Sequence, residues 1–427
     1  MIDGQEPTDP AWTSAAGSPV SAAARATFAT MFAELAPIGR DPATGGYHRF
    51  AHTAEDSRLR AWFAGQANAR HLDVHEDRAG NLWAWWGDPT AGEAVVTGSH
   101  LDSVPAGGAF DGPLGVVSAF AAVDELRARS VRPDRPLAVV AFADEEGARF
   151  GVACAGSRLL TGRLDADRAR GLTDDTGITL AEALRATGRD PDTLGPDPEL
   201  VARIGVFVEL HVEQGRDLID RGAAVGFATA IRAHGRWRYE SIGRADHAGT
   251  TRMQDRTDPM LAHAATILAA HTAARKHGAV ATVGRVAVEP NGVNAIPARV
   301  RTWLDARADH ETVVRAVVAE VTRAAGVEPV EESWTPRVEF DPRLRARLDG
   351  VLGGVPALAT GAGHDAGILA LAGVPAAMLF VRNPTGVSHA PDEHAEPGDC
   401  LAGLAALTDV LAELLTGEVL VAAEPPA

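Results

Sequence analysis

The sequence has little of three things: cysteine, long apolar runs and positive charge. It contains 2 cysteines among 427 residues, too few for a disulfide framework, so we expect a reducing compartment. No uninterrupted apolar run approaches the length of a membrane span. The 40 basic residues are outnumbered by 57 acidic ones, which gives a formal net charge of −17. Phosphates would be repelled by this balance, so we expect no nucleic-acid partner.

The amino-terminal segment also lacks the features of a targeting signal. Asp3 and Glu6 are followed by sequence rich in Ala, Ser and Thr, without a basic start and an apolar core. We therefore expect a cytoplasmic protein that does not bind a membrane. Residues 1–22 are small and polar without a period, which predicts disorder. The length of the chain predicts two domains.

Strands and helices alternate in residues 23–225 and again in residues 337–427. The pattern predicts helices over residues 23–35, 58–68, 113–129, 155–161 and 401–415, and strands over residues 81–86, 94–97, 137–143, 204–210 and 374–381. Such alternation predicts an α/β catalytic domain with a mainly parallel sheet covered by helices, which binds ligands at the carboxyl ends of its strands. The tail, residues 424–427, is predicted to fray.

Residues 226–336 have a different pattern. They predict strands over residues 237–242, 281–288 and 298–305, and helices over residues 259–277 and 311–325. This βαββαβ-like plan with one half-buried sheet face predicts a smaller α+β domain inserted into the first. Such an insertion would offer surfaces for dimerisation or for movement as a lid.

Five candidate metal ligands lie at the ends of the predicted strands. His100 and Asp111 are in a Gly-rich loop after the strand 94–97, and Glu146, His211 and His389 follow three later apolar runs. Imidazole and carboxylate are ligands that Zn²⁺, Mn²⁺ or Co²⁺ take in hydrolases, and a shared carboxylate lets two ions sit together. A single histidine is more often structural, but five candidates at strand ends predict a two-metal hydrolase.

Seven motifs follow one another in an order that resembles the M20-type amidohydrolases. They are residues 98–102 (Gly-Ser-His-Leu-Asp), 111–112 (Asp-Gly), 144–147 (Asp-Glu-Glu-Gly), 213–215 (Glu-Gln-Gly), 247–251 (His-Ala-Gly-Thr-Thr), 294–297 (Asn-Ala-Ile-Pro) and 388–393 (Ser-His-Ala-Pro-Asp-Glu). The match runs from about residue 30 to 415 and is closest to the branch of N-carbamoyl-L-amino acid hydrolases and allantoate amidohydrolases. This resemblance implies a dinuclear metal site, an inserted domain that forms a homodimer, and hydrolysis of N-carbamoyl or ureido compounds.

The resemblance also implies how the ligands divide between the ions. His100, Asp111 and His211 would hold one ion, and Asp111, Glu146 and His389 would hold the other, so that Asp111 bridges. We expect two divalent ions per subunit, Zn²⁺, Mn²⁺ or Co²⁺. Three protein ligands per ion leave room for water.

Two further acids of these motifs have predicted roles. Glu145 precedes a ligand on a turn, so its carboxylate can face the water between the ions and act as general base. Asp102 resembles the family's aspartate that holds a ligand imidazole in orientation. A plain acidic loop is the alternative for each.

The remaining site residues rest on the resemblance. His247, in the inserted domain, would stabilise the oxyanion, in its own or in the partner subunit. The family's contacts to a small-molecule substrate match Gln214, Asn294, Arg307, Gly363 and His364. Arg307 would clamp the substrate carboxylate with two hydrogen bonds.

Two arginines depart from the family pattern. Arg252 replaces a proline, and Arg382 begins a segment where carbamoylases often have a Pro-Ser pair. If either faces the cavity, an acidic substrate such as N-formyl- or N-carbamoylglutamate becomes plausible; if both face solvent, they only balance charge. The leading substrates are allantoate or an N-carbamoyl-L-amino acid. A peptidase or aminoacylase of the same superfamily, or a metal-holding binding protein without turnover, are the alternatives.

Overall fold

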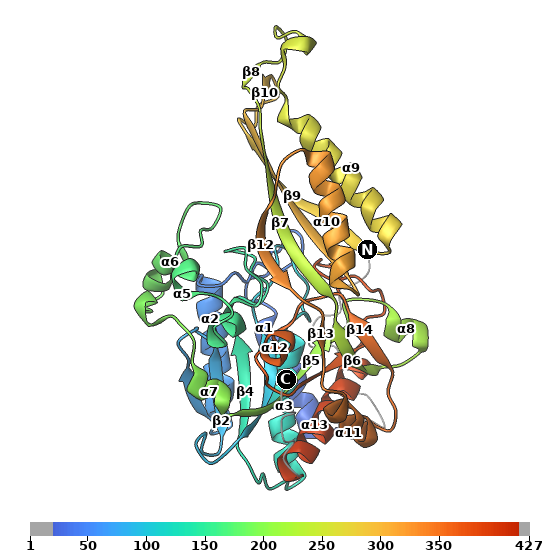
Figure 1. Ribbon diagram of the computed structural model, residues 1–427. Coiled ribbons are helices and arrows are strands. Elements are labelled where there is room, and N and C mark those ends of the chain that lie inside the picture. Colours follow the sequence, from blue (N-terminus) through green and yellow to red (C-terminus); the bar gives the residue numbers. More distant parts are fainter. Residues whose placement is uncertain (1–19, 418–427) are drawn as a thin grey trace. The chain divides into compact units, whose positions relative to one another are not determined.

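The computed structural model describes residues 20–417, which divide into two compact units (Figure 1). The first unit consists of residues 20–229, 339–360 and 364–417, and the second of residues 230–338 and 361–363. The inserted domain was predicted at residues 226–336. The predicted disordered segment, residues 1–22, lies outside the described residues except for its last three, where Ser21 caps the first helix. The predicted frayed tail also lies outside them.

The first unit is built on a sheet that has nine strands within the described residues. Their order is β1-β2-β4-β3-β5-β15-β6-β13, and β14 pairs with β6. The bounds are β1 Asp73–Glu76, β2 Leu82–Trp86, β3 Ala94–His100, β4 Leu137–Phe142, β5 Ile204–Val212, β6 Val225–Ile231, β13 Val338–Glu339, β14 Ala357–Thr360 and β15 Ala376–Val381. The four central strands, β4, β3, β5 and β15, pair in parallel, whereas β1, β2 and β6 pair antiparallel. The predicted, largely parallel α/β sheet is thus confirmed at its centre.

The central strands are buried along most of their length, as expected for parallel strands covered on both faces. The helices are α1 Ala22–Leu35, α2 Ala54–Ala69, α3 Pro113–Ala128, α4 Ala155–Leu160, α5 Ala166–Arg170, α6 Leu180–Ala186, α7 Pro198–Ala202, α8 Asp217–Arg221, α11 Pro342–Leu352, α12 Asp365–Leu371 and α13 Pro397–Thr416. Helices α1, α2, α3, α11 and α13 share one apolar core with the sheet, and α12 contacts β5 and β15 outside that core. None of the described helices is long and apolar enough to cross a membrane.

The second unit has the predicted βαββαβ order. Its elements are β7 Ala233–Ile242, β8 Asp246–His247, α9 Pro259–His277, β9 Val280–Glu289, β10 Ala295–Ile296, β11 Arg299–Ala308, α10 Glu311–Ala325 and β12 Val330–Thr335. Four strands form an antiparallel sheet in the order β12-β7-β11-β9, and β8 pairs with β10 in a separate ribbon.

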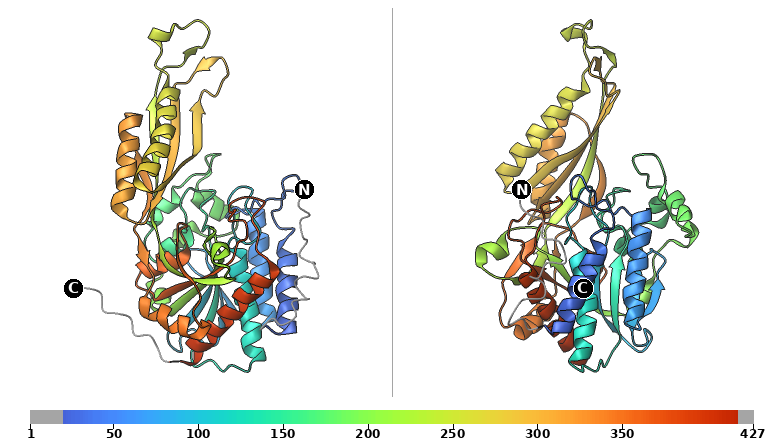
Figure 2. Two further views of the ribbon diagram at one scale, coloured as in Figure 1. Left: turned by 90° about the vertical axis from the view of Figure 1, so that its right-hand side faces the viewer. Right: turned by 180° about the vertical axis from the view of Figure 1, so that it is seen from behind.

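Burial alternates along β7 because one face of this sheet packs against the two helices (Figure 2). Val314, Val317, Val318 and Val321 recur on one side of α10 at helical spacing and are buried in that core. The half-buried sheet predicted from the sequence therefore follows from its alternating pattern.

Candidate active site

Candidate ligands meet where the parallel strands of the first unit end. His100 is the last residue of β3, and His211 is the next-to-last residue of β5. Glu146 lies in the turn after β4, and His389 lies in the loop after β15. Because the carboxyl ends of parallel strands meet at one edge of a sheet, residues far apart in the sequence come together here.

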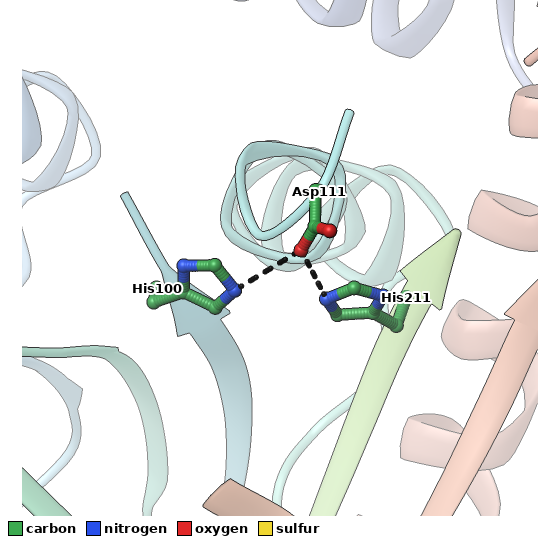
Figure 3. A group of neighbouring side chains, drawn as sticks. All are labelled: His100, Asp111 and His211. Atoms are coloured by element: carbon green, nitrogen blue, oxygen red, sulfur yellow. Dashed lines mark ion pairs between the residues drawn. The ribbon is translucent and has the colours of Figure 1, made fainter. Parts of the chain in front are cut away.

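Asp111 lies between two groups of these side chains. Its Oδ1 is 3.5 Å from Nε2 of His100 and 3.2 Å from Nε2 of His211 (Figure 3). Its Oδ2 is 3.4 Å from Nε2 of His389, and that nitrogen is 3.5 Å from Oε1 of Glu146. Within each group the ligand atoms lie within 4.8 Å of one another. One carboxylate oxygen therefore faces each group, as bridging two cations requires.

The two buried imidazoles present a lone pair to this position. Nδ1 of His100 is 3.1 Å from the carbonyl oxygen of Asp102, and Nδ1 of His211 is 2.9 Å from that of Val212. A carbonyl only accepts, so each Nδ1 carries the proton and, in the neutral ring, Nε2 carries the lone pair. Both Nε2 atoms are buried without a hydrogen-bond partner among the described residues. This donor set fits a divalent cation.

The electrostatics of the site also favour cations. Burial raises the pKa of Glu146 to about 7, and the charge of Asp111 acts in the same direction. Burial alone would lower the pKa of His389, but the hydrogen bond to Asp111 and the charge of Glu146 raise it to about 9. Burial opposes ionisation of Asp111 as well, yet its interactions with the neighbouring imidazoles of His100 and His211 hold its pKa well below the usual range. Positive charge at this position is therefore stabilised by several buried acids.

Gly112 allows the loop that carries Asp111 to pass close beneath His100. Its φ is 86°, and a Cβ at this position would lie 2.4 Å from Cε1 of the His100 ring. The left-handed conformation and the close contact both require glycine. The Asp-Gly pair is therefore a steric condition of the site.

Glu145 and Asp102 lie next to this centre. Oε2 of Glu145 is 3.7 Å from Nε2 of His100. Burial, more than any neighbouring charge, raises the pKa of Glu145 well above its usual range. The Asp102 carboxylate accepts the backbone N–H groups of Glu145 at 3.1 Å and Glu146 at 3.0 Å, while its carbonyl holds His100. Asp102 therefore ties the turn after β4 to the end of β3.

A buried cysteine adds one contact to Glu145. Sγ of Cys154 donates to Oε1 of Glu145 at 3.2 Å, and burial raises the pKa of this thiol well above its usual range. Cys154 and Cys400 are both free and buried, with 2% and 0% of their surface exposed. The contact between Cys154 and Glu145 was not predicted.

Three other polar side chains contact Asp111. Ser388 and Glu393 had no predicted role, and Gln214 was predicted to bind the substrate. Nε2 of Gln214 donates to Oδ2 of Asp111 at 2.7 Å, whereas the sequence analysis assigned Gln214 to the substrate. Oγ of Ser388 is 3.2 Å from the same oxygen. Glu393 accepts the backbone N–H of Asp111 at 2.9 Å. The one sequence signal for Ser388 and Glu393 was that both belong to the motif of residues 388–393.

Glu209, His211 and His364 form a further group of close ligand atoms. Both oxygens of Glu209 are engaged, one by the Ser99 hydroxyl at 2.8 Å and the other by the Ala366 N–H at 3.1 Å. The ring of His364 packs edge-on against His211, with 4.5 Å between centroids. Glu209 and His364 thus lie beside the candidate ligand His211.

The predicted residues of the second unit lie at two ends of its sheet. At one end His247 pairs with Ala295 in the β8–β10 ribbon, and the N–H of Ala248 donates to the carbonyl of Asn294 at 2.9 Å. His247 and Asn294 are thus neighbours. Arg252, in the loop after His247, forms an exposed ion pair of 2.6 Å with Asp255.

At the other end of the second unit, Arg307 is held by two partners. It donates to both oxygens of Asp305, at 2.7 and 2.9 Å, and to the carbonyl of Gly361 at 2.9 Å. On the opposing strand His234 pairs with Arg307, and a Cβ on Gly363 would lie 2.9 Å from Nε2 of His234. Arg307 and Gly363 therefore belong to one cluster.

Arg382, in the first unit, donates to both oxygens of Asp399 at 2.7 and 2.9 Å. The side chain of Asp399 is only 8% exposed, so releasing the arginine would leave a nearly buried carboxylate without its partner. This pair is local charge balance, one of the two alternatives that the sequence left open.

The chain is similar to known proteins over most of its length. Residues 96–413 match the model of the peptidase family M20/M25/M40. The chain is 38% identical over 400 residues to an N-carbamoyl-L-amino acid amidohydrolase of Geobacillus stearothermophilus, covering 90% of this chain and 97% of that protein. It is 32% identical over 389 residues to an allantoate amidohydrolase of Bacillus subtilis, covering 87% and 93%.

A solved structure is similar to the chain over most of its length. The crystal structure of AtUAH in complex with (S)-hydroxyglycine superposes with a TM-score of 0.86 at 27% sequence identity. The match covers 95% of this chain and 99% of that one. The similarity thus extends over both units.

Proposed function

We propose a function from the family to which the chain belongs, the peptidase family M20/M25/M40, and within it the branch of N-carbamoyl-L-amino acid and allantoate amidohydrolases. The proposed function is that of a two-metal amidohydrolase that cleaves a linear C–N bond of a ureido or N-carbamoyl acid. The position of Asp111 carries this proposal, because one of its oxygens faces His100 and His211 and the other faces His389. Hydrolysis of C–N bonds other than peptide bonds is the activity named for these relatives.

The residues present fit two divalent ions. His100, Asp111 and His211 would hold one ion, and Asp111, Glu146 and His389 the other, with Zn²⁺, Mn²⁺ or Co²⁺ as candidates. Ions bound there would polarise the scissile carbonyl and lower the pKa of water.

Glu145 is the proposed general base. Its carboxyl group lies beside His100, and burial raises its pKa, so it is suited to accept a proton from water and to return it to the leaving nitrogen. Cys154 and the turn held by Asp102 keep this carboxyl group in place.

We propose that the substrate carries one carboxylate, bound by Arg307. Asp305 and Gly361 hold the guanidinium of Arg307 in a fixed orientation, which reduces the entropy lost on binding. Arg252 and Arg382 each pair with an acid of this chain, which favours allantoate or a neutral N-carbamoyl-L-amino acid over N-acylglutamates. The ligand (S)-hydroxyglycine of the structurally similar AtUAH is likewise a small monocarboxylic acid.

We also propose that His247 acts in the partner subunit of a homodimer. In the β7–β11 pairing Arg299 lies opposite Ile242 and Arg307 opposite His234, so these two ends are eight residues apart on β11. At roughly 3.4 Å per residue that is about 27 Å, and the ribbon that carries His247 lies beyond the Arg299 end. No small ureido acid spans this length. His247 and Arg307 of one chain therefore cannot serve one substrate molecule.

Two surfaces of the second unit suit such a dimer. Strand β9 is an edge of the four-stranded sheet and offers backbone groups to a second copy of itself. On the adjacent helix α9, Leu261 and Leu268 are 72% and 69% exposed and lie two turns apart on one face. A two-fold contact through β9 and α9 would cover both.

Glu145→Gln tests the proposal directly. The substitution should leave two metal ions per chain by metal analysis and should lower kcat by about 10²–10⁴-fold, the contribution of a general base. His100→Ala should lower both metal content and kcat. Near-normal turnover by the Glu145→Gln protein would remove Glu145 from the mechanism.

A substrate panel tests the chemistry. We expect activity with allantoate or N-carbamoyl-L-amino acids, little with N-carbamoylglutamate, and none after removal of metal by a chelator. Amidation of the substrate carboxylate should raise KM strongly because it removes the partner of Arg307. Full activity in excess chelator would overturn the two-metal mechanism, and a preference for dipeptides would move the enzyme to the peptidase side of the family.

A further inference from the structure

Glu393 is a buried acid that contacts the loop of Asp111 from the far end of the chain. Its Oε1 accepts the backbone N–H groups of Phe110 at 3.0 Å and Asp111 at 2.9 Å. Its Oε2 is 3.3 Å from Oγ of Ser388. Only 5% of its surface is exposed, and the loops that it joins are separated by 282 residues in the sequence.

The loop is shaped to receive this carboxyl group. A Cβ on Gly108 would lie 2.4 Å from both Cβ and Oε1 of Glu393, so a larger residue would push the carboxyl group away. Ser388 reaches both acids, at 3.2 Å from Oδ2 of Asp111 and 3.3 Å from Oε2 of Glu393. Glu393 therefore holds the backbone of Asp111, while Ser388 contacts Oδ2 of the Asp111 carboxylate.

We propose that Glu393 is a positioning residue for the bridging carboxylate: it fixes the backbone of residues 108–111 so that the two oxygens of Asp111 face the two ligand groups at the same time. The inference rests on the proposed two-metal function. Without this anchor the N–H groups of Phe110 and Asp111 lose a buried acceptor, and the loop must shift to find another.

The length of the Glu393 side chain matters more than its charge in this role. A carboxylate only accepts hydrogen bonds, so it suits two N–H groups and one hydroxyl. Gln keeps the length, because its amide oxygen can face Phe110 and Asp111 while its NH₂ faces Ser388. Asp keeps the charge but withdraws the oxygens by about 1.5 Å, one C–C bond. A positioning role therefore predicts that Glu393→Gln is tolerated and Glu393→Asp is not.

The experiment measures metal binding as well as turnover. The metal-free wild type, Glu393→Gln and Glu393→Asp proteins are titrated with Mn²⁺ by calorimetry, and the EPR spectrum at two equivalents reports whether two Mn²⁺ ions are magnetically coupled. We expect a coupled pair in the wild type and in Glu393→Gln. In Glu393→Asp we expect loss of the coupled spectrum and Mn²⁺ binding weaker by about 10–100-fold, the usual effect of losing a group that orients a ligand. The kcat of Glu393→Asp should fall in parallel.

Asp77 provides a matched control. It is a buried acid that also accepts two backbone N–H groups, those of Ala79 and Asn81, both at 2.9 Å, but it contacts none of the metal ligands. Asp77→Asn should lower the thermal stability of the metal-free protein without changing Mn²⁺ affinity or the coupled spectrum. Unfolding curves of the metal-free variants show whether each one is folded.

Two results would overturn the role of Glu393. In one, Glu393→Asp is folded and binds two coupled Mn²⁺ ions as the wild type does. In the other, Glu393→Gln fails as badly as Glu393→Asp or worse, which would mean that the charge of Glu393 matters and not its reach. If the wild type itself shows no coupled pair, the two-metal function fails, and that result is distinct from both.

Discussion

Mixing two inactive variants gives the sharpest test of how the two units cooperate. Glu145→Gln removes the proposed base of the first unit, and His247→Ala removes the proposed oxyanion donor of the second. Each protein alone should be nearly inactive, with His247→Ala lower than wild type by about 10²–10³-fold in kcat. The separation of about 27 Å along β11 places His247 and Arg307 too far apart for one site in one chain.

The expected recovery follows from two-fold symmetry. When equal amounts exchange subunits at random, about half of the dimers contain one chain of each kind. If His247 serves the partner subunit, one site of such a dimer combines an intact Glu145 with an intact His247, and the other site has both defects. The mixture should therefore regain about a quarter of the wild-type activity per chain.

The assay is ammonia or amino acid release after unfolding and refolding the mixture with metal, followed by light scattering to establish that dimers have formed. The controls are each variant refolded alone and wild type mixed with Glu145→Gln. Absence of recovery in a mixture that is dimeric and metal-loaded would mean that His247 serves its own chain or no site. That result would also refute the inference from the spacing on β11.

Three further perturbations have defined outcomes. Asp102→Asn replaces one of two carboxylate acceptors with a donor that faces a buried N–H in the turn after β4, so it should lower the free energy of unfolding of the metal-free protein by about 2–4 kcal/mol in urea titrations; a loss below about 0.5 kcal/mol, typical of surface substitutions, would contradict this. Gly112→Ala should abolish metal binding in calorimetry because its Cβ would press on the imidazole above it, and normal binding would mean that the loop relaxes. Burial lowers the pKa of His52 to about 3. Below about pH 6.5 the unfolded chain binds a proton at this histidine, whereas the folded protein does not. The contribution of His52 to the free energy of unfolding is therefore complete above pH 6.5 and falls by about 2 kcal/mol between pH 6.5 and pH 5. Urea unfolding of wild type and His52→Gln at both pH values should show the shallower dependence in the variant, and identical dependence would refute the assignment.

Local pattern was sufficient to predict the central strands and the long helices. Strands β3, β4, β5 and β15 begin with apolar runs and are buried along most of their length because they are covered on both faces. Helix α9 begins and ends at the predicted residues. Strand β1 was missed because every residue of this edge strand is exposed, so no alternation marks it. Helix α11 was missed because it is rich in arginine and buries only Leu344 and Leu348.

The candidate ligands were accessible to sequence reasoning because each one follows an apolar strand. The residues that hold these ligands in place could not be predicted from the sequence, since they depend on contacts between distant segments. Glu393 meets Asp111 across 282 residues, and Cys154 reaches Glu145 only because of how the chain turns after β4. The acids that pair with Arg252 and Arg382 lie 3 and 17 residues further along the chain. The sequence does not tell which of several nearby acids an arginine will pair with.

The burial of both cysteines has a practical consequence for spectroscopy. Neither thiol is accessible in the native fold, and burial holds the pKa of each one well above the usual range, so thiol-reactive probes should leave the folded protein unlabelled. A single cysteine introduced at Val293, which is fully exposed beside Asn294, would then take up one dye or spin label per chain. In a homodimer the distance between the two labels would report the distance between the two ribbons that carry His247. This distance could be followed in real time while substrate is added.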